Sequence, residues 1–115
     1  MPLIVQIANL EEGYPTVNVG LLRMEKALNQ ARLRGATLLK LIHGYGSTGT
    51  GGRLRGEVRR ALERHRKAGL IAAFVAGEDF RISDETTWAL LKKYPELKQD
   101  RDLSRNNKGI TVVVL

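Results

Sequence analysis

The sequence predicts an α/β fold, organised as one domain over residues 1–115 with strands and helices in the order β-α-β-α-β-β. Three observations predict it. Four short runs of apolar and β-branched residues have the length of strands, two stretches between them place apolar residues at helical spacing, and 115 residues can bury one hydrophobic core. Alternating strands and helices imply a two-layer sandwich, in which helices pack against a mainly parallel or mixed sheet.

The first strand is expected at residues 3–9 and ends at the turn-forming residues 11–15, which include glycine and proline. Thr16 or Asn18 is expected to cap the first helix, and Gly35 to end it. One face of this helix is apolar at helical spacing, through Leu21, Met24, Leu28 and Ala31.

Residues 37–42 are almost continuously apolar, which is typical of a strand that is covered on both faces. A second helix is expected at 53–67, with an apolar face made of Leu54, Val58, Ala61 and Leu62. The third strand is expected at 70–76, and the last strand, 110–115, can pair antiparallel with it. Between these two strands, residues 78–108 look like an insertion that contains a short helix.

The charge distribution favours a polyanionic partner. The chain has 19 basic and 12 acidic residues and a net charge of +7, and residues 53–67 alone carry seven basic and two acidic side chains. Such a concentration of positive charge attracts nucleic acid, an anionic membrane or a phosphorylated ligand. The alternative is a basic helix face that is only solvated.

Other classes of protein are disfavoured by what the sequence lacks. The absence of cysteine excludes disulfides and thiolate metal sites. Because His43 and His65 are the two histidines, we assign no metal ligands, although a carboxylate site for a divalent metal stays open. No apolar run approaches the roughly 18 residues of a membrane helix, and the first residues lack a signal-peptide pattern. We therefore expect a soluble, cytoplasmic protein without a membrane partner.

A glycine-rich loop at residues 43–52 joins the second strand to the basic helix, and five of the 12 glycines lie between residues 44 and 52. Glycine permits positive φ and close approach of the backbone to a ligand. Because the loop leads into a helix N-terminus, its amides and the helix dipole form a natural anion site. Arg53 and Arg55 stand at the same end and can contact a phosphate. The alternative is a flexible loop that only reverses the chain.

Two nucleotide-binding motifs are matched only in part. Residues 44–49 fit the dinucleotide pattern G-x-G-x-x-G, but the acidic residue expected about 20 residues later is missing. Gly46 and Gly51 have the P-loop spacing, but Gly52-Arg53 stands where that motif requires lysine and a hydroxyl residue. We therefore set both motifs aside.

The motif His43-Gly44-Tyr45-Gly46 after an apolar strand, followed by Leu54-Arg55 in a basic helix, resembles the central signature of the small MutS-related (Smr) domain family. The resemblance covers about residues 3–76 and 109–115, where the last strand is also similar to the family's. It implies the fold of the C-terminal domain of bacterial translation initiation factor three, binding of DNA or RNA, and, in many members, endonuclease activity. By resemblance alone, a ribosome or a repair protein is also a partner.

The end of the first strand departs from the family pattern. Family members usually carry Leu-Asp-x-His there, a motif implicated in cleavage, whereas this chain has Ala8-Asn9-Leu10-Glu11. Three functions therefore stay open. The chain is an Smr-type endonuclease that cleaves phosphodiester bonds, a nucleic-acid-binding module without catalysis, or a protein that binds a nucleotide or phosphometabolite.

The candidate catalytic residues are His43 and Glu11. An imidazole can move a proton at the attacking or the leaving oxygen, and Glu11 can act as base, orienting group or metal ligand if the first two strands are neighbours. The alternative for His43 is a residue that contacts phosphate or braces the loop. Tyr45 can stack on a base. The candidate residues for binding nucleic acid or phosphate are Gly44, Tyr45, Gly46, Gly49, Gly51, Gly52, Arg53, Arg55 and Arg59.

Overall fold

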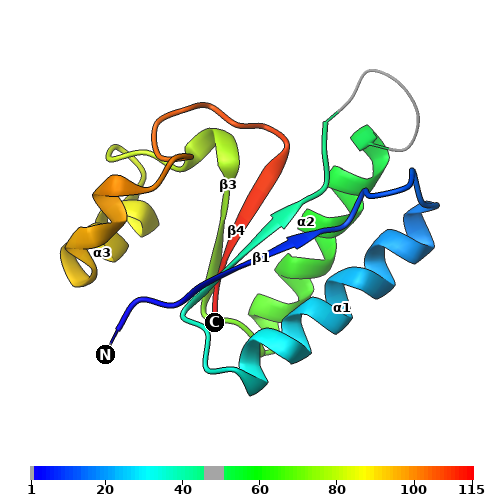
Figure 1. Cartoon of the computed structure of the whole chain (residues 1–115), viewed down its shortest axis with the longest axis horizontal. Helices are drawn as coiled ribbons and strands as arrows, with labels where there is room; N and C mark the ends of the chain where they lie inside the picture. The colour runs from blue at the N-terminus through cyan, green and yellow to red at the C-terminus, as the bar shows by residue number, and fades with distance from the viewer. Residues whose placement is uncertain (1, 46–50) are drawn as a thin grey trace.

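The computed structural model describes residues 2–45 and 51–115 (Figure 1). Within these ranges the strands are β1 (Val5–Asn9), β2 (Leu38–Ile42), β3 (Ala73–Ala76) and β4 (Ile110–Val114). The helices are α1 (Val17–Leu33), α2 (Gly51–Lys67) and α3 (Glu85–Lys93), with the short 3-10 helices η1 (Gly77–Asp79) and η2 (Pro95–Gln99). None of the described helices combines the length and the hydropathy needed to cross a bilayer.

The strands form one mixed sheet in the order β1-β2-β4-β3. β1 runs parallel to β2, with Val5 opposite Leu38, and β4 runs antiparallel to both β2 and β3. The predicted antiparallel pairing of the third and last strands is confirmed. The mixed form of the predicted sheet is confirmed: among the described strands only β1 and β2 pair in parallel, because β4 returns from the end of β3 and lies between β3 and β2.

α1 and α2 pack side by side on one face of the sheet. Thr16 caps α1, as predicted, because its hydroxyl oxygen accepts a hydrogen bond from the Val19 backbone N–H at 3.2 Å. At Gly20 the helices approach so closely that a Cβ would lie 2.5 Å from Leu54 Cδ1. Of the predicted apolar positions of both helices, Leu21 is partly buried against this core, and the others are buried in it, namely Met24, Leu28, Ala31, Leu54, Val58, Ala61 and Leu62.

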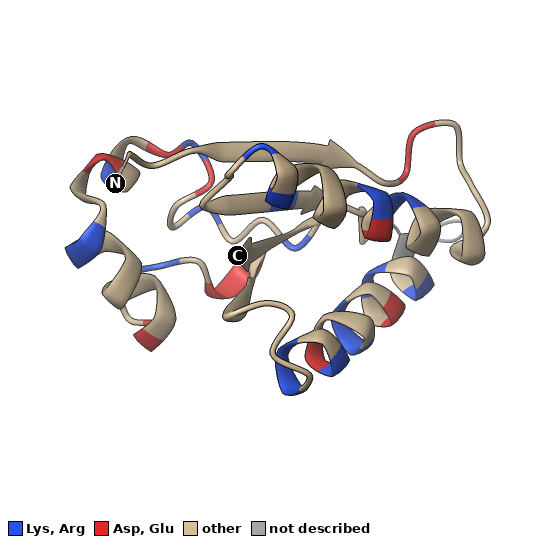
Figure 2. Ribbon diagram, turned by 90° about the horizontal axis from the view of Figure 1, so that it is seen from below, with Lys and Arg blue, Asp and Glu red and all other residues tan. Residues whose placement is uncertain are grey.

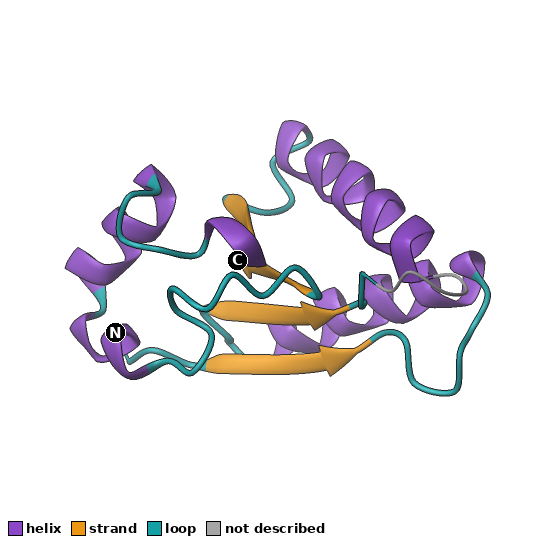
Figure 3. Ribbon diagram, turned by 90° about the horizontal axis from the view of Figure 1, so that it is seen from above, coloured by secondary structure: helices purple, strands orange, loops and turns teal. Residues whose placement is uncertain are grey.

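The β3–β4 segment, residues 77–109, packs on the opposite face of the sheet, so that the strands lie between α1 and α2 on one side and α3 on the other (Figures 1 and 3). Its buried side chains include Phe80, Leu90, Leu91, Tyr94 and Leu97. β2 is therefore covered on both faces, as its apolar sequence predicts, and a partial third layer joins the expected two. β1 stays open on this face, where Ile7 is 61% exposed.

One charged residue interrupts the apolar sequence of β2. The Lys40 side chain is buried, and its Nζ lies 2.6 Å from Asp100 Oδ1 and 2.7 Å from Asp102 Oδ2. Asp102 also accepts a hydrogen bond from the Asn107 side-chain amide at 3.2 Å. Because both carboxylates belong to the β3–β4 segment, this ion-pair cluster fixes the segment against the sheet.

Candidate functional site

The parallel pairing of β1 and β2 brings the chain around Glu11 and His43 to the same edge of the sheet. The adjacency of the first two strands, on which the predicted pairing of these residues depends, is therefore confirmed. Gly46 and Gly49 lie outside the described residues. Gly51 and Gly52 form the start of α2, followed by Arg53 and Arg55 in its first turns.

His43 is fully buried, and both of its ring nitrogens are hydrogen-bonded within the protein. Nδ1 lies 2.7 Å from the Gly44 carbonyl oxygen, which can only accept, so Nδ1 carries the proton. Nε2 then accepts a hydrogen bond from the Thr111 hydroxyl at 2.8 Å, and the Thr111 oxygen accepts one from Arg59 Nε at 3.0 Å. The imidazole thus links the end of β2 to β4 and, through Thr111, to α2.

Burial lowers the pKa of His43 to about 4. The hydrogen bond to the Gly44 carbonyl opposes this shift, whereas the charges of Arg59 and Arg55 add to it. His43 is therefore neutral near pH 7. This geometry matches the loop-bracing alternative, because an imidazole in this position must give up its bond to Thr111 before it can accept another proton.

Gly44 has a backbone N–H that was expected to be free to bind a phosphate but is not free in the structure. Its backbone N–H donates to the Gly109 carbonyl oxygen at 3.0 Å, so this amide is already used by the protein. Its φ of +72° is in the left-handed region that favours glycine, and a Cβ would lie 2.1 Å from Glu11 Oε2. Gly44 therefore gives the Glu11 carboxylate room to lie against the backbone, and Glu11 makes no hydrogen bond to the His43 ring.

Arg59, predicted as a phosphate contact, is instead held inside the protein by Glu78. Its Nη1 and Nη2 donate to the two Glu78 carboxylate oxygens at 3.0 and 2.8 Å, and Nη2 also donates to the Ile110 carbonyl at 3.1 Å. Arg55 Nη2 shares Glu78 at 3.1 Å, but its side chain is 32% exposed. Burial raises the pKa of Glu78, and the hydrogen bonds from Arg59 outweigh it and hold the pKa below its usual value.

Basic residues recur along α2 (Figure 2), and several of their side chains are exposed to solvent. Arg60 pairs with Glu57 at 2.6 Å, and this hydrogen bond, with the nearby charges of Arg53 and Arg64, lowers the pKa of Glu57. Exposed cations recur along one side of α2 at helical spacing, and we call this set the basic stripe. It consists of Arg53, Arg60, Arg64 and Lys67. With Glu57 included, the stripe has four positive charges and one negative charge.

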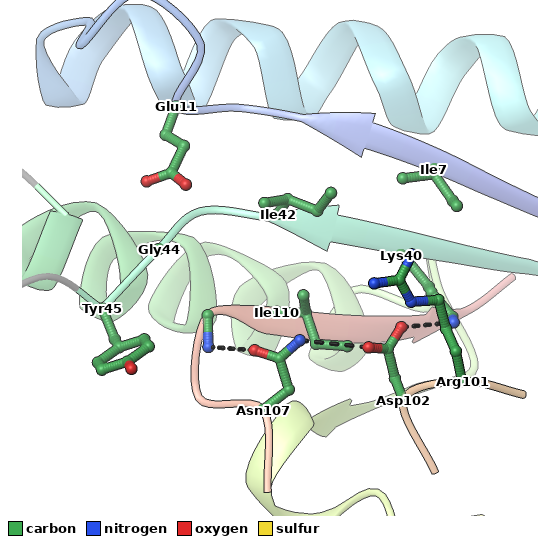
Figure 4. Close-up of a pocket in the computed structure, with 11 residues that line it drawn as sticks. Ile7, Glu11, Lys40, Ile42, Gly44, Tyr45, Arg101, Asp102, Asn107 and Ile110 are labelled. Atoms are coloured by element: carbon green, nitrogen blue, oxygen red, sulfur yellow. Dashed lines mark hydrogen bonds and ion pairs between the residues drawn. The ribbon is translucent and has the colours of Figure 1, made fainter. Parts of the chain in front are cut away.

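A cavity of about 460 Å³ opens on the sheet face opposite α1 and α2 (Figure 4). Ile7, Ile42 and Ile110 are its apolar residues, while Glu11 and Tyr45 stand at one end. Its other end is formed by Lys40 and its partner Asp102 from the β3–β4 segment, beside Arg101. The sequence carries no signal for this cavity, because its lining comes from segments far apart in the chain. Among the described residues, no three histidine or acidic side chains converge on a potential metal site.

The chain is similar to a known protein family and to a solved structure. The family model described as the Smr domain matches residues 15–92. Among solved structures, the Smr domain of Thermus thermophilus MutS2 is similar, with a TM-score of 0.56 and 25% sequence identity over 98% of each chain. No curated protein sequence matches.

Proposed function

The chain belongs to the Smr domain family, and from this premise we propose that it binds the sugar-phosphate backbone of DNA or RNA through α2 and does not cleave it at His43. The observation that carries the proposal is the basic stripe. Its four cations are exposed on one side of one helix, whereas Arg59 of the same helix is only partly exposed and pairs with Glu78. An exposed, mostly positive helix surface is the electrostatic footprint of a protein that contacts phosphates.

The first turn of α2 adds to this surface. The backbone N–H groups of the first four residues of a helix have no acceptor within the helix, and the dipole makes this end positive. Gly52 is exposed and Arg53 follows it, so a phosphate can approach this end closely. Arg60 is available as well, because an exposed ion pair such as Arg60–Glu57 contributes little and exchanges readily for a phosphate contact.

Phosphate contacts predict a strong salt dependence. We expect the triple variant Arg53→Gln, Arg60→Gln, Arg64→Gln to bind a single-stranded oligonucleotide at least about tenfold more weakly at 0.1 M salt. We expect the slope of log K against log salt to become shallower by about 2, since each lost phosphate contact removes about 0.7. Fluorescence anisotropy over a salt series measures both quantities.

A matched control removes three exposed cations elsewhere, with Lys26→Gln, Lys98→Gln and Arg105→Gln. These side chains lie on α1 and on the β3–β4 segment, so their loss changes the net charge equally but leaves the basic stripe intact. If the control weakens binding as much as the α2 variant does, only the overall charge matters and the assignment to α2 is wrong.

The proposal that His43 does not cleave is supported by three observations. The imidazole is buried and both nitrogens are engaged, its pKa is about 4, and the Asn9 side chain, where the family's cleavage motif has aspartate, accepts a hydrogen bond from the Glu11 backbone N–H at 3.0 Å. The last bond holds the turn after β1. The site therefore offers a hydrogen-bonded loop at the position where the family resemblance implies a motif for cleavage.

We expect the wild-type protein and His43→Ala to give the same background when incubated with single-stranded RNA, structured RNA and supercoiled DNA, with and without divalent metal. Circular dichroism confirms that the variant is folded, and Glu11→Gln provides a second variant that leaves the His43 hydrogen bonds in place. Wild-type cleavage that disappears in either folded variant would establish an endonuclease and overturn the binding-only proposal.

A further inference from the structure

The cavity on the open face of the sheet has the size of a binding site for a small group, and its lining is partly apolar. Its volume of about 460 Å³ lies in the range of roughly 300–1,000 Å³ that is typical of small-ligand sites. Ile7 is 61% exposed although it belongs to the sheet, so the chain leaves apolar surface uncovered there. Tyr45, at the edge of the cavity, is 58% exposed.

The polar groups at the two ends of the cavity differ in charge. The Glu11 carboxylate reaches from the loop after β1 toward Ile42 and Gly44 (Figure 4), and it accepts no hydrogen bond from the described part of the chain. At the other end Lys40 and Asp102 form an ion pair, whereas Arg101 is exposed. Within residues 2–45 and 51–115, the site thus presents a carboxylate without a hydrogen-bond partner near an aromatic ring, and a cation further along.

We propose that this cavity binds one unpaired base of a nucleic-acid strand and that Glu11 selects guanine; this inference rests on the proposed function. The isoleucines and Tyr45 offer apolar and aromatic surface to the face of a base, as in other proteins that bind single strands. A carboxylate can only accept hydrogen bonds, so it favours an edge that presents donors side by side.

Guanine alone among the common bases meets that condition. Its Watson–Crick edge places the N1–H and the N2 amino group next to each other, and both can donate to one carboxylate. Adenine and cytosine place a ring nitrogen acceptor beside the amino group, and uracil and thymine flank one donor with two carbonyl acceptors. Each of these bases would bring an acceptor against the Glu11 carboxylate, which costs affinity.

The position of the cavity is compatible with the backbone site on α2. Tyr45 and the first turn of α2 lie at the same edge of the sheet, where β1 and β2 end (Figures 1 and 4). A strand whose phosphates contact α2 can therefore turn one base over this edge onto the open face. Arg101 can then pair with the next phosphate along the strand.

The test compares short oligothymidines that carry one central guanine, inosine, adenine or cytosine, with affinity measured by fluorescence anisotropy at one salt concentration. We expect guanine to bind about tenfold more tightly than adenine or cytosine, because a bidentate contact gives discrimination of this order. Inosine lacks the 2-amino donor and should be intermediate. In Glu11→Gln the affinities should converge, and Tyr45→Ala should weaken all four oligonucleotides at least about fivefold.

Glu12→Gln is the matched control, since Glu12 is exposed beside Glu11 but does not line the cavity; it should keep the guanine preference. If the wild-type protein binds all four oligonucleotides equally while the salt dependence persists, the inference is overturned and the proposed function stands. If none of them binds, the proposed function fails and the inference fails with it. A guanine preference that survives Glu11→Gln would assign the selection to another residue and also overturn the inference.

Discussion

Replacing Lys40 by methionine is expected to lower the free energy of unfolding by about 3–5 kcal/mol, because it leaves two partly buried carboxylates without their cation. The Asp100 and Asp102 side chains are only 11% and 14% exposed, and each lies within 2.7 Å of Lys40 Nζ. Burial raises the pKa of Asp102, but the hydrogen bonds from Lys40 and Asn107 outweigh it and hold the pKa below its usual value. Without Lys40 its hydrogen bond no longer opposes the effect of burial on the pKa of Asp102, and the two carboxylates repel each other.

The triple variant Lys40→Met, Asp100→Asn, Asp102→Asn is the control for this prediction. It removes all three charges together. In the wild-type protein the two carboxylates accept hydrogen bonds from the Asp102 backbone N–H and the Asn107 side-chain amide, and the amide oxygens of the two asparagines can accept the same bonds. Replacing a whole buried ion pair is often nearly neutral, so most of the lost stability should return. Urea denaturation at pH 7 measures all three proteins. A loss below about 1 kcal/mol in Lys40→Met, or no recovery in the triple variant, would contradict the role given to this cluster.

The strands and helices of this fold could be predicted from local sequence, and so could the pairing of β1 with β2 and of β3 with β4, whereas the pairing of β2 with β4 could not. Apolar runs and the Thr16 cap depend on neighbouring residues, and the expected elements match β1, α1, β2, α2, β3 and β4 closely. The central position of β4 depends on pairing between residues far apart, such as Leu39 with Val113. Lys40 is the one residue of β2 that signals the buried ion pair in the sequence. A lysine in a strand predicted to be covered on both faces requires a buried acidic partner.

In the candidate site, too, some features could be predicted from local sequence, and others depend on residues far apart in the chain. Periodicity places Arg53 and Arg59 on different sides of α2, but it does not say which side faces the protein. That depends on Glu78 and on Thr111, which reach Arg59 from η1 and β4 and have no sequence motif. His43 and Gly44 could be singled out from their motif, yet their hydrogen bonds to Thr111 and Gly109 depend on β4 lying next to β2.

The buried position of His43 has a consequence for stability that can be measured without any ligand. The pKa of His43 is about 4 in the folded protein and about 6.5 in an unfolded chain. Between these two values the unfolded state binds a proton that the folded state excludes. Stability must therefore rise with pH in this range and fall as the pH is lowered. Carboxylates with lowered pKa, such as Glu78 and Asp102, add to the loss only at lower pH, because their unfolded values lie near 4.

We therefore expect the free energy of unfolding to fall by about 2 kcal/mol between pH 7.5 and pH 5, as the difference between the two pKa values of His43 requires. Urea denaturation at a series of pH values measures the loss, and an NMR titration of the His43 ring protons should show the ring at least about nine-tenths neutral above pH 5. In His43→Gln the slope between these pH values should nearly vanish, whatever the stability of that variant at pH 7.5. His65→Gln, which removes the partner of Glu25 at the α1–α2 contact, should keep the slope. Equal stability of the wild-type protein at the two pH values would show that His43 takes up a proton in the folded state. The His43 imidazole would then be available for acid–base chemistry.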